Sequence, residues 1–107
     1  MNMAYVQIET TFANIKDAED MAGILLSKHL IACGQYYEIT SLYNWEGKRQ
    51  KESEILLKLK TQAELYGDCE KVIKKNHPYK TPQITFTSMD GSKEYLEWMN
   101  DSKKVLK

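Results

Sequence analysis

The chain has 107 residues, 42% of them hydrophobic and 28% charged, which fits one globular domain with its own core. Fifteen Lys and Arg residues balance fifteen Asp and Glu residues, and a formal charge of zero argues against a polyanionic partner or an anionic membrane surface. No segment is apolar over the length that crosses a bilayer, and no basic region precedes an apolar run at the N-terminus. We therefore expect a single cytoplasmic domain, residues 1–107, that binds neither nucleic acid nor a membrane.

The first half of the sequence predicts a strand, a helix and a long hairpin. Residues Ala4–Thr10 read as a buried strand, and Asn14 offers a cap for a helix over Ile15–His29, where apolar residues recur at helical spacing. Two alternating segments, Ala32–Glu46 and Glu52–Lys60, flank a Glu-Gly-Lys turn and predict the hairpin.

The second half predicts a helix, a strand and a short terminal helix. Thr61–Glu64 fits a capping box for a helix that ends at His77, because Pro78 disfavours helical geometry in the residue before it. A fourth strand covers Gln83–Ser88, and Ser92 can cap the last helix. The order βαββαβ with a short C-terminal helix predicts an α+β, ferredoxin-like sandwich, in which helices cover one face of an antiparallel sheet.

The central hairpin carries more aromatic surface than one small domain can bury. Five residues of its first strand share a face by the period-two rule: Tyr37, Ile39, Ser41, Tyr43 and Trp45. A strand over residues 36–46 is about 35 Å long at about 3.3 Å per residue, whereas a domain of this size has a radius of gyration of about 13 Å. We therefore expect the hairpin to project and to be covered by another copy of the chain, with Tyr43, Trp45 and Trp98 as interface anchors.

Two groups of residues are candidates for function. His77 stands before a rigid proline at a helix-to-strand junction, where a preorganised imidazole could bind a metal, act as an acid or donate a hydrogen bond. The alternative is a histidine that only contacts the terminal carbonyls of its helix. The second group could line a polar cleft between subunits, or form an ion pair with aromatic packing that fixes the assembly: Trp45, Glu54, Lys60 and Tyr79.

Other chemistries find little support in the sequence. Cys33 and Cys69 are far apart and form no Cys-x-x-Cys pair, so both are expected to be reduced core residues. The chain has no nucleophile elbow, no His-Glu-x-x-His motif and no phosphate-binding glycine loop. The glycine-aromatic signature of RNA-recognition motifs is also absent. We expect a protein that is not an enzyme.

Several motifs are spread over nearly the whole chain: Leu30-Ile31-Ala32-Cys33, Ser41-Leu42-Tyr43-Asn44-Trp45-Glu46-Gly47-Lys48, Glu54 with Lys60-Thr61, His77-Pro78-Tyr79 with Pro82, and Tyr95-Leu96-Glu97-Trp98. Together they resemble the CutA family of divalent-cation tolerance proteins. The resemblance implies a ferredoxin-like subunit and a tight homotrimer whose long hairpins pair between subunits. It also implies a role in tolerance of copper and other divalent metals.

The resemblance further implies where a metal would bind. Copper ligands proposed in this family resemble a cysteine at the end of the first strand and two histidines directly before Pro-Tyr. The corresponding positions here are Thr10, Asn76 and His77. Threonine and a neutral amide are poor partners for a soft or borderline metal, so His77 is the metal-ligand candidate, for copper or another divalent cation.

Two other functions stay open at this point. The trimer implied by the resemblance is similar in architecture to the PII signalling proteins, which suggests a small-molecule sensor or adaptor that uses the clefts between subunits. Such a protein would pass a signal to a partner protein. The trimer could also be chiefly a stable scaffold without a ligand.

Overall fold

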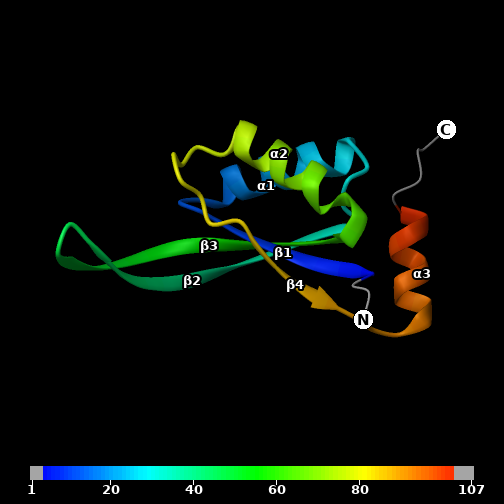
Figure 1. Cartoon of the computed structure of the whole chain (residues 1–107). Helices are drawn as coiled ribbons and strands as arrows, with labels where there is room; N and C mark the ends of the chain where they lie inside the picture. The colour runs from blue at the N-terminus through cyan, green and yellow to red at the C-terminus, as the bar shows by residue number, and fades with distance from the viewer. Residues whose placement is uncertain (1–3, 103–107) are drawn as a thin grey trace.

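The structure, a computed structural model, describes residues 4–102 as a four-stranded antiparallel sheet with helices packed around it (Figure 1). The elements follow in the order β1 (Tyr5–Phe12), α1 (Ile15–Ser27), β2 (Cys33–Trp45), β3 (Lys48–Gln62), the 3₁₀ turn η1 (Ala63–Leu65), α2 (Tyr66–Asn76), β4 (Thr85–Met89) and α3 (Lys93–Ser102). The strand order is β2-β3-β1-β4, so β2 and β4 form the two edges. The predicted ferredoxin-like order with a terminal helix is confirmed.

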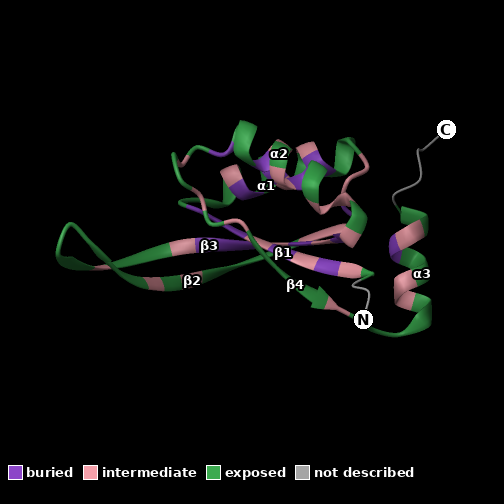
Figure 2. Cartoon of the chain, in the orientation of Figure 1, coloured by how far each residue is buried: buried purple, intermediate pink, exposed green. Residues whose placement is uncertain are grey.

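The core lies between the sheet and the two helices α1 and α2, which cover one of its faces (Figures 1 and 2). Alternate residues of β1 and β3 point into it, because successive side chains of a strand face opposite sides of the sheet. Gly34 of β2 lets α1 approach closely, since a Cβ at this position would lie 3.2 Å from the Cβ of Ala22. The fully buried core residues include Val6, Ile8, Phe12, Leu25, Leu57, Leu59, Cys69 and Ile73.

Local signals set most of the helix ends. Asn14 caps α1 as expected, with its Oδ1 accepting from the Asp17 N–H at 2.9 Å. The Tyr95 N–H donates to Ser92 Oγ at 3.2 Å, which confirms the predicted cap of α3. Helix α2 ends at Asn76, and His77 before the proline is extended, as predicted.

Several strand bounds differ from those predicted, and two predictions at helix ends are wrong. The capping box at Thr61–Glu64 does not form, because Thr61 belongs to β3, pairs with Val6 and donates its hydroxyl to the Leu30 carbonyl at 2.6 Å. Pairing with β1 therefore extends β3 to its end at Gln62. The first helix ends at Ser27 rather than His29, which has a left-handed φ of 58°.

The β2–β3 hairpin projects beyond the body of the molecule, as predicted (Figures 1 and 2). Glu46 and Gly47 at its turn both have positive φ, which matches the twist of paired strands. The molecule measures 48 × 32 × 22 Å, with a radius of gyration of 14.8 Å. Helix α3 stands at the opposite end of the sheet from the hairpin turn. Among the described helices, none has the length and apolar character that a membrane span requires.

Candidate functional site

His77 occupies the junction between α2 and the segment that leads to β4. Its ring stacks on Phe12 with centroids 4.3 Å apart, and the residue is only 9% exposed. The Tyr79 N–H donates to Nδ1 at 3.1 Å, so the proton of the neutral ring is on Nε2, which donates to the Thr11 carbonyl at 2.8 Å. Burial lowers the pKa of His77 below its ordinary value of 6.5, in spite of an opposing contribution from the bond to Thr11.

This bonding bears on the prediction that His77 is a metal ligand, which remains a prediction. A ligating imidazole must offer a nitrogen lone pair, and here one nitrogen accepts a backbone hydrogen bond while the other carries the proton. His77 instead connects β1 to the segment after α2 through its hydrogen bonds to the Thr11 carbonyl and the Tyr79 N–H. Ligation would require the loss of at least one of these two bonds.

The other two positions of the implied copper site add no suitable ligand. Thr10 is fully buried and its Oγ1 has no hydrogen-bond partner among the described residues. The amide nitrogen of Asn76 donates to the Val72 carbonyl at 2.8 Å. Among residues 4–102, no three or more His, Cys, Asp and Glu side chains gather where they could hold a metal. The donors present therefore do not fit a copper site, whose affinity comes from thiolate and imidazole.

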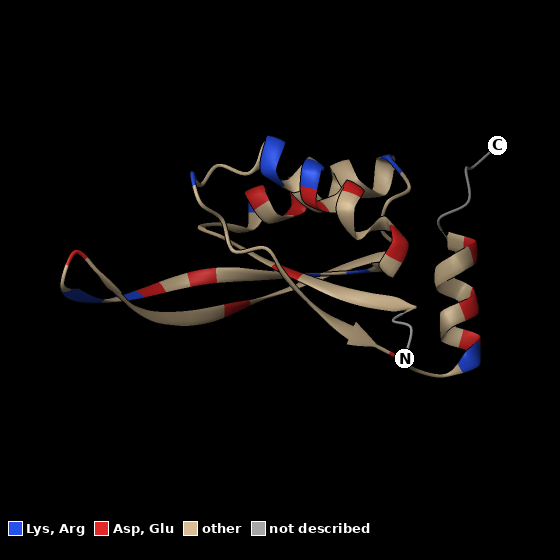
Figure 3. Cartoon of the chain, viewed as in Figure 1, with Lys and Arg blue, Asp and Glu red and all other residues tan. Residues whose placement is uncertain are grey.

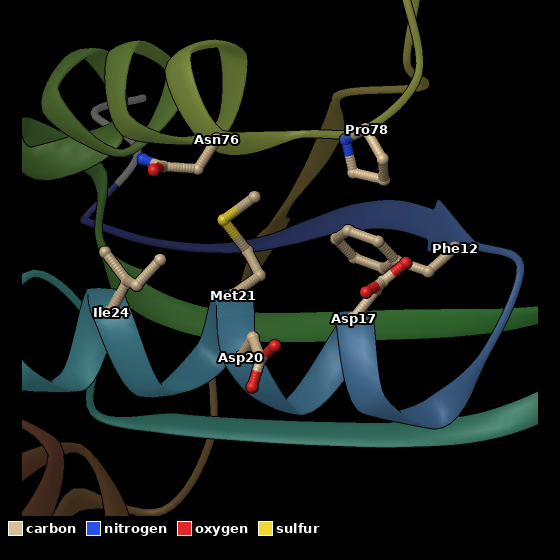
Figure 4. Close-up of a pocket in the computed structure, with 7 residues that line it drawn as sticks. All are labelled: Phe12, Asp17, Asp20, Met21, Ile24, Asn76 and Pro78. Atoms are coloured by element: carbon tan, nitrogen blue, oxygen red, sulfur yellow. The ribbon is translucent and has the colours of Figure 1, made fainter.

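A small pocket of about 230 Å³ lies next to this junction, between α1 and the end of α2 (Figure 4). Phe12 and Met21 give it apolar walls, and two carboxylates of α1 border it. Asp17 accepts from the side chain of Asn14 at 3.2 Å, and Asp20 pairs with Lys16 at 2.7 Å. Each carboxylate therefore already has one polar partner on its own helix or at its cap.

A larger cleft lies on the face of the sheet that α1 and α2 leave uncovered. We call it the open-face cleft; its volume is about 640 Å³. It forms where the projecting hairpin meets the segment between α2 and β4. Its lining residues are Thr11, Tyr43, Trp45, Gln50, Glu52, Glu54, Tyr79, Lys80, Thr81 and Gln83.

Three of the four residues predicted for a cleft do line this one, namely Trp45, Glu54 and Tyr79. Lys60 does not join them within one chain. Its Nζ lies 3.2 Å from the Tyr95 hydroxyl and 5.1 Å from the centroid of that ring, beneath α3. The separation follows from strand geometry, because six residues along a strand cover about 20 Å.

Hydroxyl groups hold the two carboxylates of the cleft. Glu54 accepts from Ser41 Oγ at 2.6 Å through one oxygen and from the Tyr79 hydroxyl at 3.4 Å through the other. The Tyr43 hydroxyl donates to Glu52, and this bond raises the pKa of Tyr43. Burial and the adjacent charge of Glu54 raise the pKa of Tyr79 to about 12.

Neither Glu52 nor Glu54 takes part in an ion pair within residues 4–102. The ion pairs there lie along helices, as in Lys16–Asp20 and Lys93–Glu97. Figure 3 shows acidic positions along the projecting half of β3. Sequence reasoning missed Glu52, although the period of two places it on the same face as Glu54.

The predicted interface residues are all exposed in the single chain. Tyr43 is 41% exposed, Trp45 63% and Trp98 48%. Two of them, Tyr43 and Trp45, also line the open-face cleft. The hairpin therefore presents its aromatic rings outward, both at the cleft and on the adjoining surface.

Comparisons with known proteins give a consistent result. The family described as CutA1 divalent ion tolerance protein matches residues 6–102. The divalent-cation tolerance protein CutA of Pyrococcus horikoshii is 35% identical over 98 residues, which cover 91% of this chain and 96% of that protein. The crystal structure of divalent ion tolerance protein CutA1 from Ehrlichia chaffeensis has a TM-score of 0.90 at 30% identity, covering 98% of this chain and 100% of that one. A structure from Archaeoglobus fulgidus, described as the periplasmic divalent cation tolerance protein CutA, has a TM-score of 0.89 at 32% identity, covering 94% and 99%.

Proposed function

The chain belongs to the CutA1 divalent ion tolerance family, and from this premise we propose that it acts in divalent-cation tolerance as a homotrimer without enzymatic activity. The uncovered hairpin carries the proposal. Leu42 is 65% exposed and Trp45 63%, on a strand that forms an open edge of the sheet. Exposed apolar surface on an edge strand favours pairing with another chain, and a closed ring covers every such edge.

We further propose that divalent cations affect this trimer without copper ligation by His77. The two hydrogen bonds of its imidazole support this, as does the lack of thiolate or imidazole at Thr10 and Asn76. A cytoplasmic location is part of the proposal, and the low cysteine content, two in 107 residues, favours it.

Native mass spectrometry tests assembly and metal binding together. We expect the mass of three chains with and without added Cu²⁺, and no stoichiometric copper adduct. Leu42→Lys, which places a charge on the hairpin, should lower the trimer fraction. Leu26→Lys is a matched control on the exposed side of α1 and should leave it unchanged. A lone chain at micromolar concentration contradicts the assembly, and a copper adduct that disappears in His77→Gln contradicts the proposed role of His77.

The open-face cleft favours a second candidate function, a small-molecule sensor or adaptor built like the PII proteins. It combines aromatic rings with two carboxylates on a surface next to the proposed subunit contacts. Titration calorimetry tests this second function. Heat from a small organic ion that is lost in Glu54→Gln supports the sensor, and the absence of heat from any such ion contradicts it.

A further inference from the structure

We propose that Asp90 is a site of spontaneous covalent modification, at which the linkage to Gly91 converts to isoaspartate through a succinimide. Both residues belong to the short connection between β4 and α3 (Figure 1). The reaction takes place within one chain and uses only water as a second reactant. It therefore goes beyond the proposed function and is independent of the response to copper and of any ligand in the open-face cleft.

The chemistry needs a side-chain carboxyl followed by an unhindered backbone amide. The nitrogen of Gly91 attacks Cγ of Asp90, a new N–Cγ bond forms and the Cγ–OH bond breaks, so that one water leaves with the amide proton. Water then opens the succinimide ring. Cleavage of the bond from the nitrogen to Cγ restores aspartate, whereas cleavage of the bond from the nitrogen to the main-chain carbonyl carbon gives isoaspartate. One water is lost and one is regained, so no oxidant or reductant takes part.

The structure places the two reacting groups of this linkage against each other. The Gly91 N–H donates to Asp90 Oδ1 at 2.8 Å, so the attacking nitrogen already lies beside the side-chain carboxyl. Both residues are exposed and lie outside the described helices and strands. A Cβ added to Gly91 would meet no atom within 4 Å, so the ring has room to close. Glycine also adopts the backbone dihedrals that ring closure demands at little steric cost.

Among residues 4–102, which hold every aspartate of the chain, only Asp90 combines these features. The others all lie in helices and are all followed by a residue with a Cβ: Asp17, Asp20, Asp68 and Asp101. In a helix, the N–H that follows such an aspartate points to the carbonyl four residues earlier in the chain. The nitrogen is therefore held away from the carboxyl, and we expect isoaspartate at position 90 only.

The modification acts on the attachment of α3. It routes the main chain through Cβ and Cγ of Asp90, which lengthens the connection by one methylene group. That connection runs between two anchored points, because Met89 pairs with Tyr5 in the sheet and Asn100 of α3 donates to the Tyr5 hydroxyl at 3.1 Å. Within it, Ser92 caps α3 by accepting a backbone N–H at 3.2 Å. The longer connection displaces this cap and weakens the first turn of α3.

Peptide mapping of the full-length protein, aged in neutral buffer enriched in heavy-oxygen water, tests the proposal. Chromatography separates the isoaspartate and aspartate peptides, and each passage through the succinimide adds one heavy oxygen to residue 90. Gly91→Ala fits the open space at this position and should slow the accumulation at least about fivefold, because its Cβ hinders ring closure. Gly23→Ala, also in open space, is the matched control and should leave the rate unchanged. Asp90→Glu should take up no heavy oxygen, because the longer side chain disfavours the ring.

The chain unfolded in guanidinium sets the time scale of the measurement. The proposal is overturned if the folded protein has formed no isoaspartate at residue 90 when the unfolded chain has formed it, since the fold then protects the linkage. It is also overturned if Gly91→Ala reacts as fast as the parent. Hydrogen exchange of the α3 amides reports the consequence: faster exchange in the isoaspartate fraction than in fresh protein supports the displaced cap, and equal exchange overturns it.

Discussion

Replacement of His77 by alanine tests whether this residue fastens β1 to the segment after α2. The change removes two hydrogen bonds and leaves the Thr11 carbonyl and the Tyr79 N–H without these partners in a site that is 9% exposed. It also removes the stack on Phe12 at 4.3 Å. Lost bonds of about 1 kcal/mol each and a ring contact of about 1 kcal/mol predict a loss of about 2 to 4 kcal/mol in the free energy of unfolding.

The pH dependence of this loss identifies its cause. The pKa of His77 is lower in the folded protein than its ordinary value of 6.5, so the unfolded chain binds the proton more readily. The contribution of neutral His77 to the free energy of unfolding is therefore complete above about pH 6.5, and it is lost as the pH falls through the lower pKa of the folded state. We expect the stability difference between the parent and His77→Ala to narrow from pH 7 to pH 5.

Urea unfolding followed by circular dichroism, at one fixed chain concentration, measures this difference. His29→Asn is the control, because asparagine tolerates the left-handed φ of 58° and should change stability by less than about 0.5 kcal/mol. A cost below about 1 kcal/mol for His77→Ala, or a difference that does not vary between pH 7 and pH 5, would refute the reasoning.

Two further predictions concern the packing of the core. Gly34→Val should destabilise the protein by about 1 to 3 kcal/mol in urea unfolding, because even a Cβ at this position would lie 3.2 Å from the Cβ of Ala22. Gly23 on α1 has open space around it, so Gly23→Ala should stabilise the protein by up to about 1 kcal/mol. Equal effects of the two changes would contradict the close approach of α1 to β2. Thr61→Val should lower the free energy of unfolding by about 1 to 3 kcal/mol, because the Leu30 carbonyl loses its 2.6 Å hydrogen bond from the Thr61 hydroxyl. An unchanged free energy of unfolding in the same assay would show that this hydrogen bond does not stabilise the protein.

The candidate site was predictable in part from strand periodicity. Alternation places Trp45 and Glu54 on one face of the hairpin, and both do line the open-face cleft. The same rule put Lys60 on that face, but could not show that α3 would bring Tyr95 against it. Nor could it show that Tyr79, from a separate segment, would reach Glu54. Contacts between distant segments depend on how the elements pack, which no local pattern contains.

The sequence by itself determined the order of the elements, the caps at Asn14 and Ser92, the end of α2 before Pro78 and the projecting hairpin. Each of these depends on neighbours a few residues away, through dihedral preference, capping or periodicity. Only the tertiary structure decided that Thr61 joins a strand and that both nitrogens of His77 are occupied. The physical reason is that a buried polar group takes whichever partner the packed chain brings to it, and here the partners of His77 include a carbonyl 66 residues away along the chain.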